Sequence, residues 1–246
     1  MKSLVIDIGN TSIAYGIYHS GKISNLKYID TADQNDEKII NQFSKMKIDA
    51  VAIASVVPSK NITWKRYLSH AGHSKQLWVN SDCDLGVEIN YPFPREIGAD
   101  RLANAAAAAK WIGLPAIICD FGTALTFDII DQKNGYIGGV ICPGLPLMFD
   151  YLSEKTENLP RIKPIKCSQN IGKSTKQAIL VGVQNGYLGM INEVLKGIKK
   201  DLKVNRINIC FTGGDANWIL QNTSIKANYL KNLTLMGIGR VLELNS

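Results

Sequence analysis

One pattern occurs twice in this 246-residue chain and limits its fold more than any other feature. Residues 4–17 read as a buried apolar strand, an Asp-x-Gly turn with a threonine, and a second strand of alternating apolar residues. Residues 116–130 repeat this order around Asp120-Phe-Gly-Thr123. Asp7 and Asp120 are 113 residues apart, close to half the chain length. The repeat predicts two related halves, residues 1–114 and 115–246.

The segments around the repeat alternate between strand and helix signals, which is typical of α/β architecture. In the first half we expect strands at 50–55 and 76–79, a helix near 36–45, and another after Pro58. In the second half we expect a long helix from about Ser174 to Lys200 and a strand at 207–211.

Composition narrows the class of protein. The chain is 46% hydrophobic and 20% charged, which predicts a globular core and not a disordered or disulfide-dependent chain. No apolar run approaches the roughly 18 residues that span a bilayer, so we expect no membrane partner and a cytoplasmic protein. Five widely spaced cysteines without C-x-x-C spacing indicate neither a disulfide framework nor a zinc site.

The two Asp-x-Gly turns have the chemistry of phosphate binding. Glycine lets backbone amides approach an anion, the threonine hydroxyl can donate to phosphate oxygens, and the aspartate can organise a hydrated Mg²⁺. Two such turns facing each other would hold a nucleotide polyphosphate from both sides. Either turn alone also fits a plain hairpin corner, where Asn and Gly are favoured.

A third segment, Thr212-Gly-Gly214, follows a predicted strand and precedes a helix. Bare glycine backbone at a helix start can lie against a flat ligand group. The alternative is an ordinary strand-to-helix turn.

A proline-shaped loop, Tyr91-Pro-Phe-Pro94, leads to Gly98-Ala99-Asp100-Arg101 and an alanine-rich helix. Asp100, ionised at pH 7, could orient an alcohol and accept its proton, and the planar fork of Arg101 suits a carboxylate. The alternative is a helix-capping aspartate followed by a surface arginine.

Together, Asp7-x-Gly9-Asn10-Thr11, Asp120-Phe-Gly122-Thr123 and Thr212-Gly-Gly214 resemble the phosphate and adenosine motifs of the superfamily of acetate kinases, sugar kinases, Hsp70 and actin. Within it, Pro94-Arg-Glu-Ile-Gly98-Ala-Asp100-Arg101 resembles the P-x-x-x-G-x-D-R motif of type III pantothenate kinases. The match covers roughly residues 3–240 and continues through 138–144, 159–160, 171–175 and 233–237. The resemblance implies a duplicated actin-like (ribonuclease H-like) ATPase fold with a mixed sheet in each half.

The same resemblance implies phosphorylation of pantothenate by ATP, the first committed step towards coenzyme A, in a homodimer. It makes Asp100 the proton acceptor, and it assigns Asp120 to a monovalent cation, K⁺ or NH₄⁺. Asp7 is our candidate for Mg²⁺. The residues implied to bind ATP are Asp7, Ile8, Gly9, Asn10, Thr11, Ser12, Ile13, Ala14 and Thr123. Those implied to bind pantothenate are Tyr91, Gly98, Ala99, Asp100, Arg101 and Thr175.

Two alternatives stay open at this point. The first is an accessory binding protein of the same fold, in which the net charge of +7 would attract nucleic acid, for example at residues 196–203. Those lysines also fit a solvated helix end, and the acidic motif positions are all present, so we expect no nucleic-acid partner. The second is a kinase of this superfamily for another small hydroxy acid.

Overall fold

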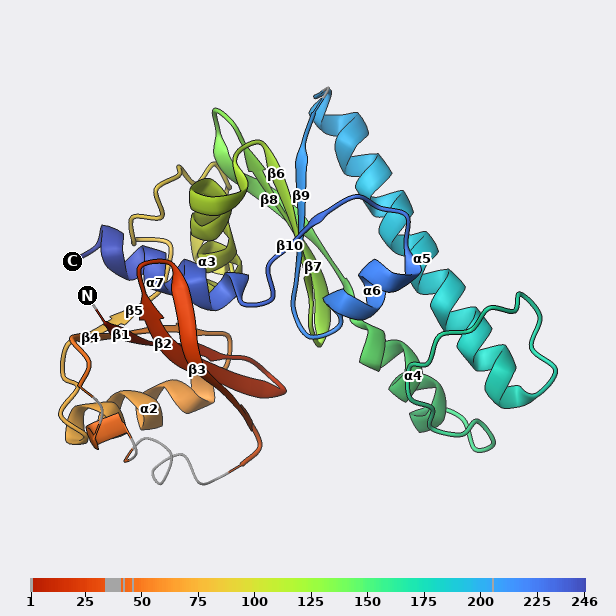
Figure 1. The fold of residues 1–246 in the computed structure, drawn as a ribbon, viewed down its shortest axis with the longest axis horizontal. Helices are drawn as coiled ribbons and strands as arrows, with labels where there is room; N and C mark the ends of the chain where they lie inside the picture. The colour runs from red at the N-terminus through yellow and green to blue at the C-terminus, as the bar shows by residue number, and fades with distance from the viewer. Residues whose placement is uncertain (1, 34–40, 42, 46, 205) are drawn as a thin grey trace. The chain divides into compact units, whose positions relative to one another are not determined.

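The computed structural model describes residues 2–33, 41, 43–45, 47–204 and 206–246, and these form two units (Figure 1). The first unit contains Met1–Leu114, Asp128–Gly138 and Asn232–Ser246, and the second contains Pro115–Phe127 and Gly139–Lys231. The sequence halves and the units therefore share the boundary after Leu114. The later segments 128–138 and 232–246 belong to the first unit.

The first unit is built on a five-stranded mixed sheet of order β3-β2-β1-β4-β5. Its central strand β1 pairs antiparallel with β2 and parallel with β4, which places Asp7 opposite both Ala14 and Ala54. A strand covered on both faces of its sheet is buried on both faces, and this explains the unbroken apolar run before Asp7. The strands are β1 Ser3–Ile8, β2 Ser12–His19, β3 Lys22–Asp30, β4 Ala50–Ser55 and β5 Gln76–Trp78.

Helices cover both faces of this sheet (Figure 1). α2 (Pro58–His70) buries Trp64 and Leu68 in a core with side chains of β1 and β4. α7 (Leu233–Leu244) lies on the other face, where Gly239 meets the ring of Tyr18. α3 (Ala99–Ala107) packs on α7 and continues into the π-helical turn η3 (Ala108–Ile112).

Short 3-10 turns complete the first unit, η1 at Phe43–Lys45 and η2 at Pro94–Glu96. The helix expected near 36–45 lies mostly outside the described residues.

The second sheet has the order β10-β9-β6-β7-β8. β6 and β9 pair in parallel, and their register places Asp120 opposite Thr212. The strands are β6 Ala116–Phe121, β7 Ala124–Asp131, β8 Gly135–Pro143, β9 Asn208–Thr212 and β10 Asn228–Tyr229. The α/β class, predicted from the alternation of strands and helices, is confirmed, and so are the two mixed sheets that the family resemblance implies.

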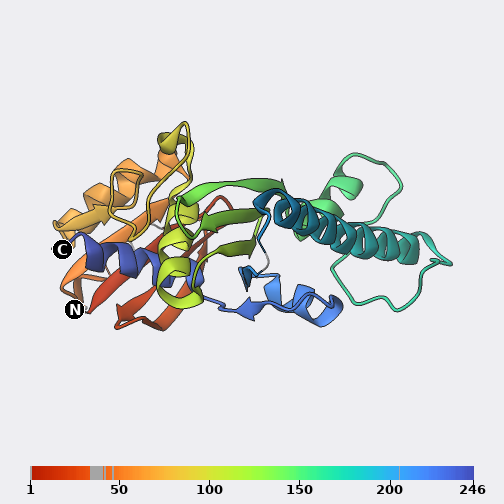
Figure 2. The same cartoon turned by 90° about the horizontal axis from the view of Figure 1, so that it is seen from above.

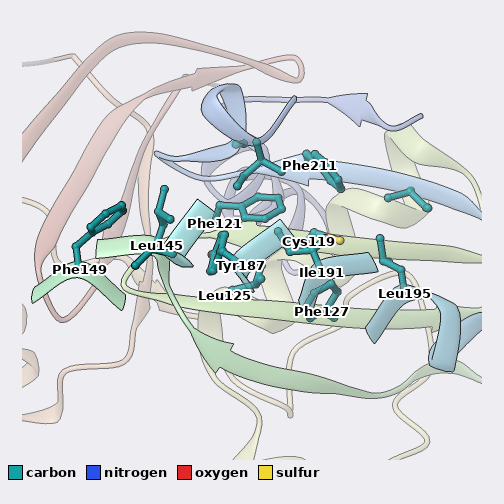
Figure 3. Close-up of a cluster of buried hydrophobic side chains, with 14 of the residues drawn as sticks. Cys119, Phe121, Leu125, Phe127, Leu145, Phe149, Tyr187, Ile191, Leu195 and Phe211 are labelled. Carbon is teal, nitrogen blue, oxygen red and sulfur yellow. The ribbon is translucent and has the colours of Figure 1, made fainter. Parts of the chain in front are cut away.

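The core of the second unit lies between this sheet and α5 (Thr175–Leu202), as Figure 3 shows. Tyr187, Ile191 and Leu195 are spaced four residues apart and so share one face of the helix. β6 and β9 contribute Phe121 and Phe211, whose rings meet edge-on with centroids 4.9 Å apart. α4 (Leu145–Glu154) and α6 (Ala216–Asn222) complete this core.

α5 is one unbroken helix of 28 residues beside the irregular segment 155–174 (Figure 2). In the part of the chain that the structure describes, no helix combines the length and apolar character needed to cross a membrane.

Candidate active site

The first phosphate turn joins β1 to β2. The Gly9 amide donates to the carbonyl of Ser12 at 3.1 Å, and this closes the turn. Thr31 braces it, because its hydroxyl donates to the Gly9 carbonyl at 2.7 Å and its amide donates to the Thr11 carbonyl at 3.0 Å. Asn10 and Thr11 at the tip are exposed. The turn is therefore held in shape while its tip stays accessible to an anion.

The strand end before this turn lies at the same sheet edge as the end of β4. The Val56 amide donates to the Ile8 carbonyl at 3.1 Å. Gly98 lies next to Val56, since a Cβ on Gly98 would be 3.4 Å from Val56 Cγ1. Asp7 is half-buried at this edge. Parallel pairing of β1 and β4 thus brings the first phosphate turn and the 94–101 segment together in one unit.

A cavity of about 560 Å³ opens at this edge of the first unit. It is lined by residues at and after the end of β4, by those that follow β5, and by the loop that leads into α3. These are Ser55, Val56, Pro58, Val79, Asn80, Ser81, Asp82, Arg95, Glu96, Ile97, Gly98 and Ala99. Two of the predicted pantothenate contacts, Gly98 and Ala99, therefore border a cavity of ligand size.

Asp100 lies in the first turn of α3 and is half-buried. One of its carboxylate oxygens, Oδ1, accepts the Arg101 amide at 2.8 Å. A Cβ at Gly98 would be 2.5 Å from the same oxygen, so glycine there leaves room for the carboxylate in this position. Burial raises the pKa of the Asp100 carboxyl, although the amide and the charge of Arg101 oppose the shift. A carboxylate with a raised pKa is the better proton acceptor near neutral pH.

The Arg101 side chain is held by a buried carboxylate. Its Nε donates to Asp128 Oδ1 at 2.6 Å, and Asp128 is fully buried in β7. The Tyr136 hydroxyl donates to the same oxygen at 3.2 Å. Burial is the largest single influence on the pKa of the Arg101 guanidinium and lowers it, but the charge and hydrogen bond of Asp128, together with Tyr136 and Asp100, outweigh burial and the pKa is raised. Arg101 is therefore a permanent cation.

Sequence reasoning missed Asp128 and Tyr136. The available signal was a single acid inside the apolar run 127–130, where a carboxylate requires a partner. The partner could not be read from spacing, because 27 residues separate Asp128 from Arg101.

Tyr91 reaches the same cluster through Tyr136. Their rings meet edge-on at 72°, with centroids 6.2 Å apart. A Cβ on Gly138 would lie 3.7 Å from the Tyr91 ring, so the backbone of β8 passes close beside it. Tyr91, Gly98, Ala99, Asp100 and Arg101 all belong to the first unit.

Thr175 lies in the second unit as the exposed first residue of α5. It borders a cavity of about 860 Å³ whose lining includes Leu147, Met148 and Tyr151 of α4.

In the second unit, the second phosphate turn adjoins the predicted adenosine motif. The Gly144 amide donates to the Thr123 carbonyl at 3.0 Å. Gly213 has a φ of +92°, and a Cβ there would be 2.5 Å from Asp120 Oδ1. Only glycine allows this close approach at a left-handed position. Two motifs about 90 residues apart in sequence are thus adjacent through the β6–β9 pairing.

The two carboxylates that we predict to bind cations, Asp7 and Asp120, do not belong to a cluster of metal-ligating side chains in the described part of the chain. Asp7 and Asp120 each stand half-buried at the end of a strand, and within the described residues no group of three His, Cys, Asp or Glu side chains could hold a metal ion. Mg²⁺ in nucleotide sites is commonly held by one or two carboxylates, waters and substrate phosphates. A lone strand-end aspartate fits that mode of binding.

The two sheets and the phosphate turns described above first define the fold class of the protein. Two α/β units with mixed five-stranded sheets and an Asp-x-Gly turn after a central strand form an actin-like ATPase fold. MreB 5 of Spiroplasma citri bound to AMPPNP is similar in fold, with a TM-score of 0.51, 12% identity, and 98% of this chain and 95% of that chain covered. A structure described as a Baf family transcriptional activator from Campylobacter jejuni has a TM-score of 0.61, 20% identity and 98% coverage of both chains.

The family follows from the sequence comparisons. The family model of type III pantothenate kinases matches residues 3–197. Type III pantothenate kinase of Methylacidiphilum infernorum is 36% identical over 98% of this chain and 88% of its own length. That of Akkermansia muciniphila is 37% identical over 100% of both chains. The chain belongs to the type III pantothenate kinase family and is a phosphotransferase.

Proposed function

We propose that this protein transfers the γ-phosphoryl group of ATP to the terminal hydroxyl of pantothenate, the first committed step towards coenzyme A. The observation that carries the proposal is the placement of the family motif 94–101. It lies at the edge of the first sheet where the β1–β2 phosphate turn begins, and it borders a cavity of about 560 Å³. Family membership supports the same substrates.

Asp100 is the proposed proton acceptor. Phosphoryl transfer has a loose transition state, so positioning and charge neutralisation supply most of the catalysis. Asp100 orients the pantothenate hydroxyl and takes its proton late, which is worth about 10² to 10⁴ in rate. Its raised pKa and its place in the first turn of α3 suit this role. Arg101 offers a permanent positive charge to the acidic substrate.

The phosphate groups of ATP are the proposed ligands of the two turns. The exposed tip of the first turn and Thr123 of the second can donate to phosphate oxygens. Bound Mg²⁺ would neutralise phosphate charge, and Asp7 is the residue we propose to hold it through a carboxylate oxygen or a coordinated water. Asp120 is the proposed ligand of a monovalent cation, K⁺ or NH₄⁺.

We also propose that the protein works as a homodimer in the cytoplasm. The dimer rests on the family resemblance. Five free cysteine thiols suit a reducing compartment.

The test is an ADP-coupled assay with ATP, Mg²⁺ and pantothenate, run in K⁺, NH₄⁺ or Na⁺ at equal ionic strength. We expect phosphopantothenate, identified by mass spectrometry, with turnover that depends on K⁺ or NH₄⁺. Asp120→Asn should lose this cation dependence and most of the activity, whereas Asp131→Asn, at the last residue of β7, serves as the matched control.

Absence of turnover in every cation, with ATP binding intact, would overturn the proposal. Two further measurements then separate the alternatives. Turnover of another hydroxy acid or a sugar would indicate a different acceptor, and a salt-sensitive gel shift with DNA or RNA would indicate an accessory binding protein.

A further inference from the structure

Asp128 is the one charged residue that the structure buries completely within the described part of the chain. A buried carboxylate is strongly unfavourable unless charged or hydrogen-bonding partners compensate it. Asp128 Oδ1 accepts from Arg101 Nε at 2.6 Å and from the Tyr136 hydroxyl at 3.2 Å. Such a buried pair is weak evidence for stability as such, because apolar residues of equal volume often serve as well. We therefore look for the role of the Arg101–Asp128 pair in the side chains that it orients.

The geometry of Arg101 indicates what is oriented. Its side chain is only 14% exposed, and its guanidinium carbon lies 5.9 Å from the centroid of the Tyr136 ring. The ion pair uses Nε, and Nη2 is buried without a hydrogen-bond partner among the described residues. A guanidinium has five donors in a fixed plane, so fixing Nε also fixes where the remaining donors point.

Tyr136 connects this ion pair to the loop before α3. Its amide donates to the Glu88 carbonyl at 2.8 Å, and its carbonyl accepts the Asn90 amide at 2.9 Å. Tyr91, which follows Asn90 in the chain, meets the Tyr136 ring edge-on. Gly135 permits this approach, since any Cβ there would collide with the Glu88 backbone. The Tyr136 side chain therefore contacts Asp128, Arg101 and Tyr91.

We propose that Asp128 and Tyr136 are positioning residues for substrate binding: together they fix the Arg101 guanidinium and the Tyr91 ring in the orientation that receives the acidic acceptor substrate. Neither residue contacts the substrate. The proposal rests on the proposed function for the identity of that substrate, and on the contacts above for the positioning.

The test compares two variants with a matched pair. Tyr136→Phe removes one hydroxyl, and Asp128→Asn removes the charge while keeping an oxygen acceptor. The matched pair is Tyr18→Phe and Glu243→Gln, because Glu243 likewise accepts a tyrosine hydroxyl, from Tyr18 at 2.8 Å, and pairs with Arg240 at 3.3 Å. That pair lies between β2 and α7 of the same unit, outside the proposed site.

We expect Tyr136→Phe to raise KM for pantothenate about three- to tenfold and Asp128→Asn to raise it at least about tenfold, as for loss of a neutral and a charged hydrogen bond respectively. KM for ATP should stay within about twofold, because the ATP-binding turns are intact, and kcat should change less than KM for pantothenate. Tyr18→Phe and Glu243→Gln should leave all three constants within about twofold even if they lower the melting temperature.

The contrary result is a fall in melting temperature for Tyr136→Phe and Asp128→Asn with an unchanged KM for pantothenate, which would make the cluster purely structural. If Asp128→Asn does not fold, Tyr136→Phe still decides the question.

A second readout does not depend on turnover. In ¹⁵N-labelled protein the Arg101 Nε–H signal, assigned with Arg101→Lys, should exchange slowly with solvent and should shift and exchange faster in Tyr136→Phe. An unchanged signal in that variant would overturn the positioning role. If the wild type does not phosphorylate pantothenate but Tyr136→Phe still changes the Arg101 Nε–H signal, only the proposed function is overturned.

Discussion

At the scale of single residues, the position of Asp100 favours catalysis over the stability of the fold. Its carboxylate sits at a helix N-terminus, where negative charge is favoured, yet it is sufficiently buried for its pKa to be raised. A carboxyl with a raised folded-state pKa stabilises the fold fully only below its unfolded pKa, and that stabilisation is lost as pH rises through the folded-state value. At neutral pH, Asp100 therefore serves chemistry at some cost to folding.

The Asp100→Asn variant tests both halves of this statement. We expect kcat to fall at least about tenfold with ATP affinity retained, because the amide cannot accept a proton. In the wild type, kcat/KM should fall as the pH drops through the raised pKa of Asp100. The melting temperature of Asp100→Asn at pH 7 should be equal to or higher than that of the wild type. Steady-state kinetics, nucleotide titration and thermal unfolding measure these quantities.

Glu193→Gln is the control for this variant, since it removes an exposed carboxylate on α5 that pairs only at the surface with Lys196. Undiminished kcat in Asp100→Asn would remove Asp100 from its role as proton acceptor.

At the scale of elements, two helical glycines show how the same residue type meets opposite demands. In α7, a Cβ on Gly237 would overlap the backbone of Ala103 in α3, so the two helices approach more closely than any larger residue allows. The alanine-rich sequence of α3 fits this close contact. In α5, a Cβ on Gly197 would meet nothing within 4 Å.

Alanine at these two positions should therefore change stability in opposite directions. Gly237→Ala should lower the free energy of unfolding by about 1–3 kcal/mol, because it overpacks the α3–α7 contact. Gly197→Ala should raise it by about 0.5–1 kcal/mol, because alanine costs less backbone entropy in a helix. Urea unfolding of both variants beside the wild type gives the comparison, and a destabilised Gly197→Ala or a neutral Gly237→Ala would contradict it.

At the scale of the whole molecule, the family resemblance predicts a homodimer. Light scattering behind size exclusion should give twice the mass of one chain, and the mass should persist on dilution to the concentrations used in the kinase assay. A single-chain mass at those concentrations, with full activity, would contradict the dimer. The net charge of +7 enters such measurements as well, since low salt can promote non-specific binding to surfaces or polyanions.

The sequence by itself predicted the α/β class, the repeated turn and a long helix from about Ser174 to Lys200, which the structure has at Thr175–Leu202. These features depend on local periodicity, glycine and capping signals. The motif around Asp100 and Arg101 could also be identified from the sequence, because its residues are contiguous. Their roles in catalysis and binding remain predictions.

Only the tertiary structure placed residues 128–138 and 232–246 in the first unit, and so brought Asp128 and Tyr136 to Arg101. It also set Gly213 against Asp120. These contacts join residues far apart in the chain, and their partners are selected by sheet register and by the need to pair a buried charge. An acid inside an apolar run signals that a partner is needed, but no local pattern in the sequence says which distant residue that partner is.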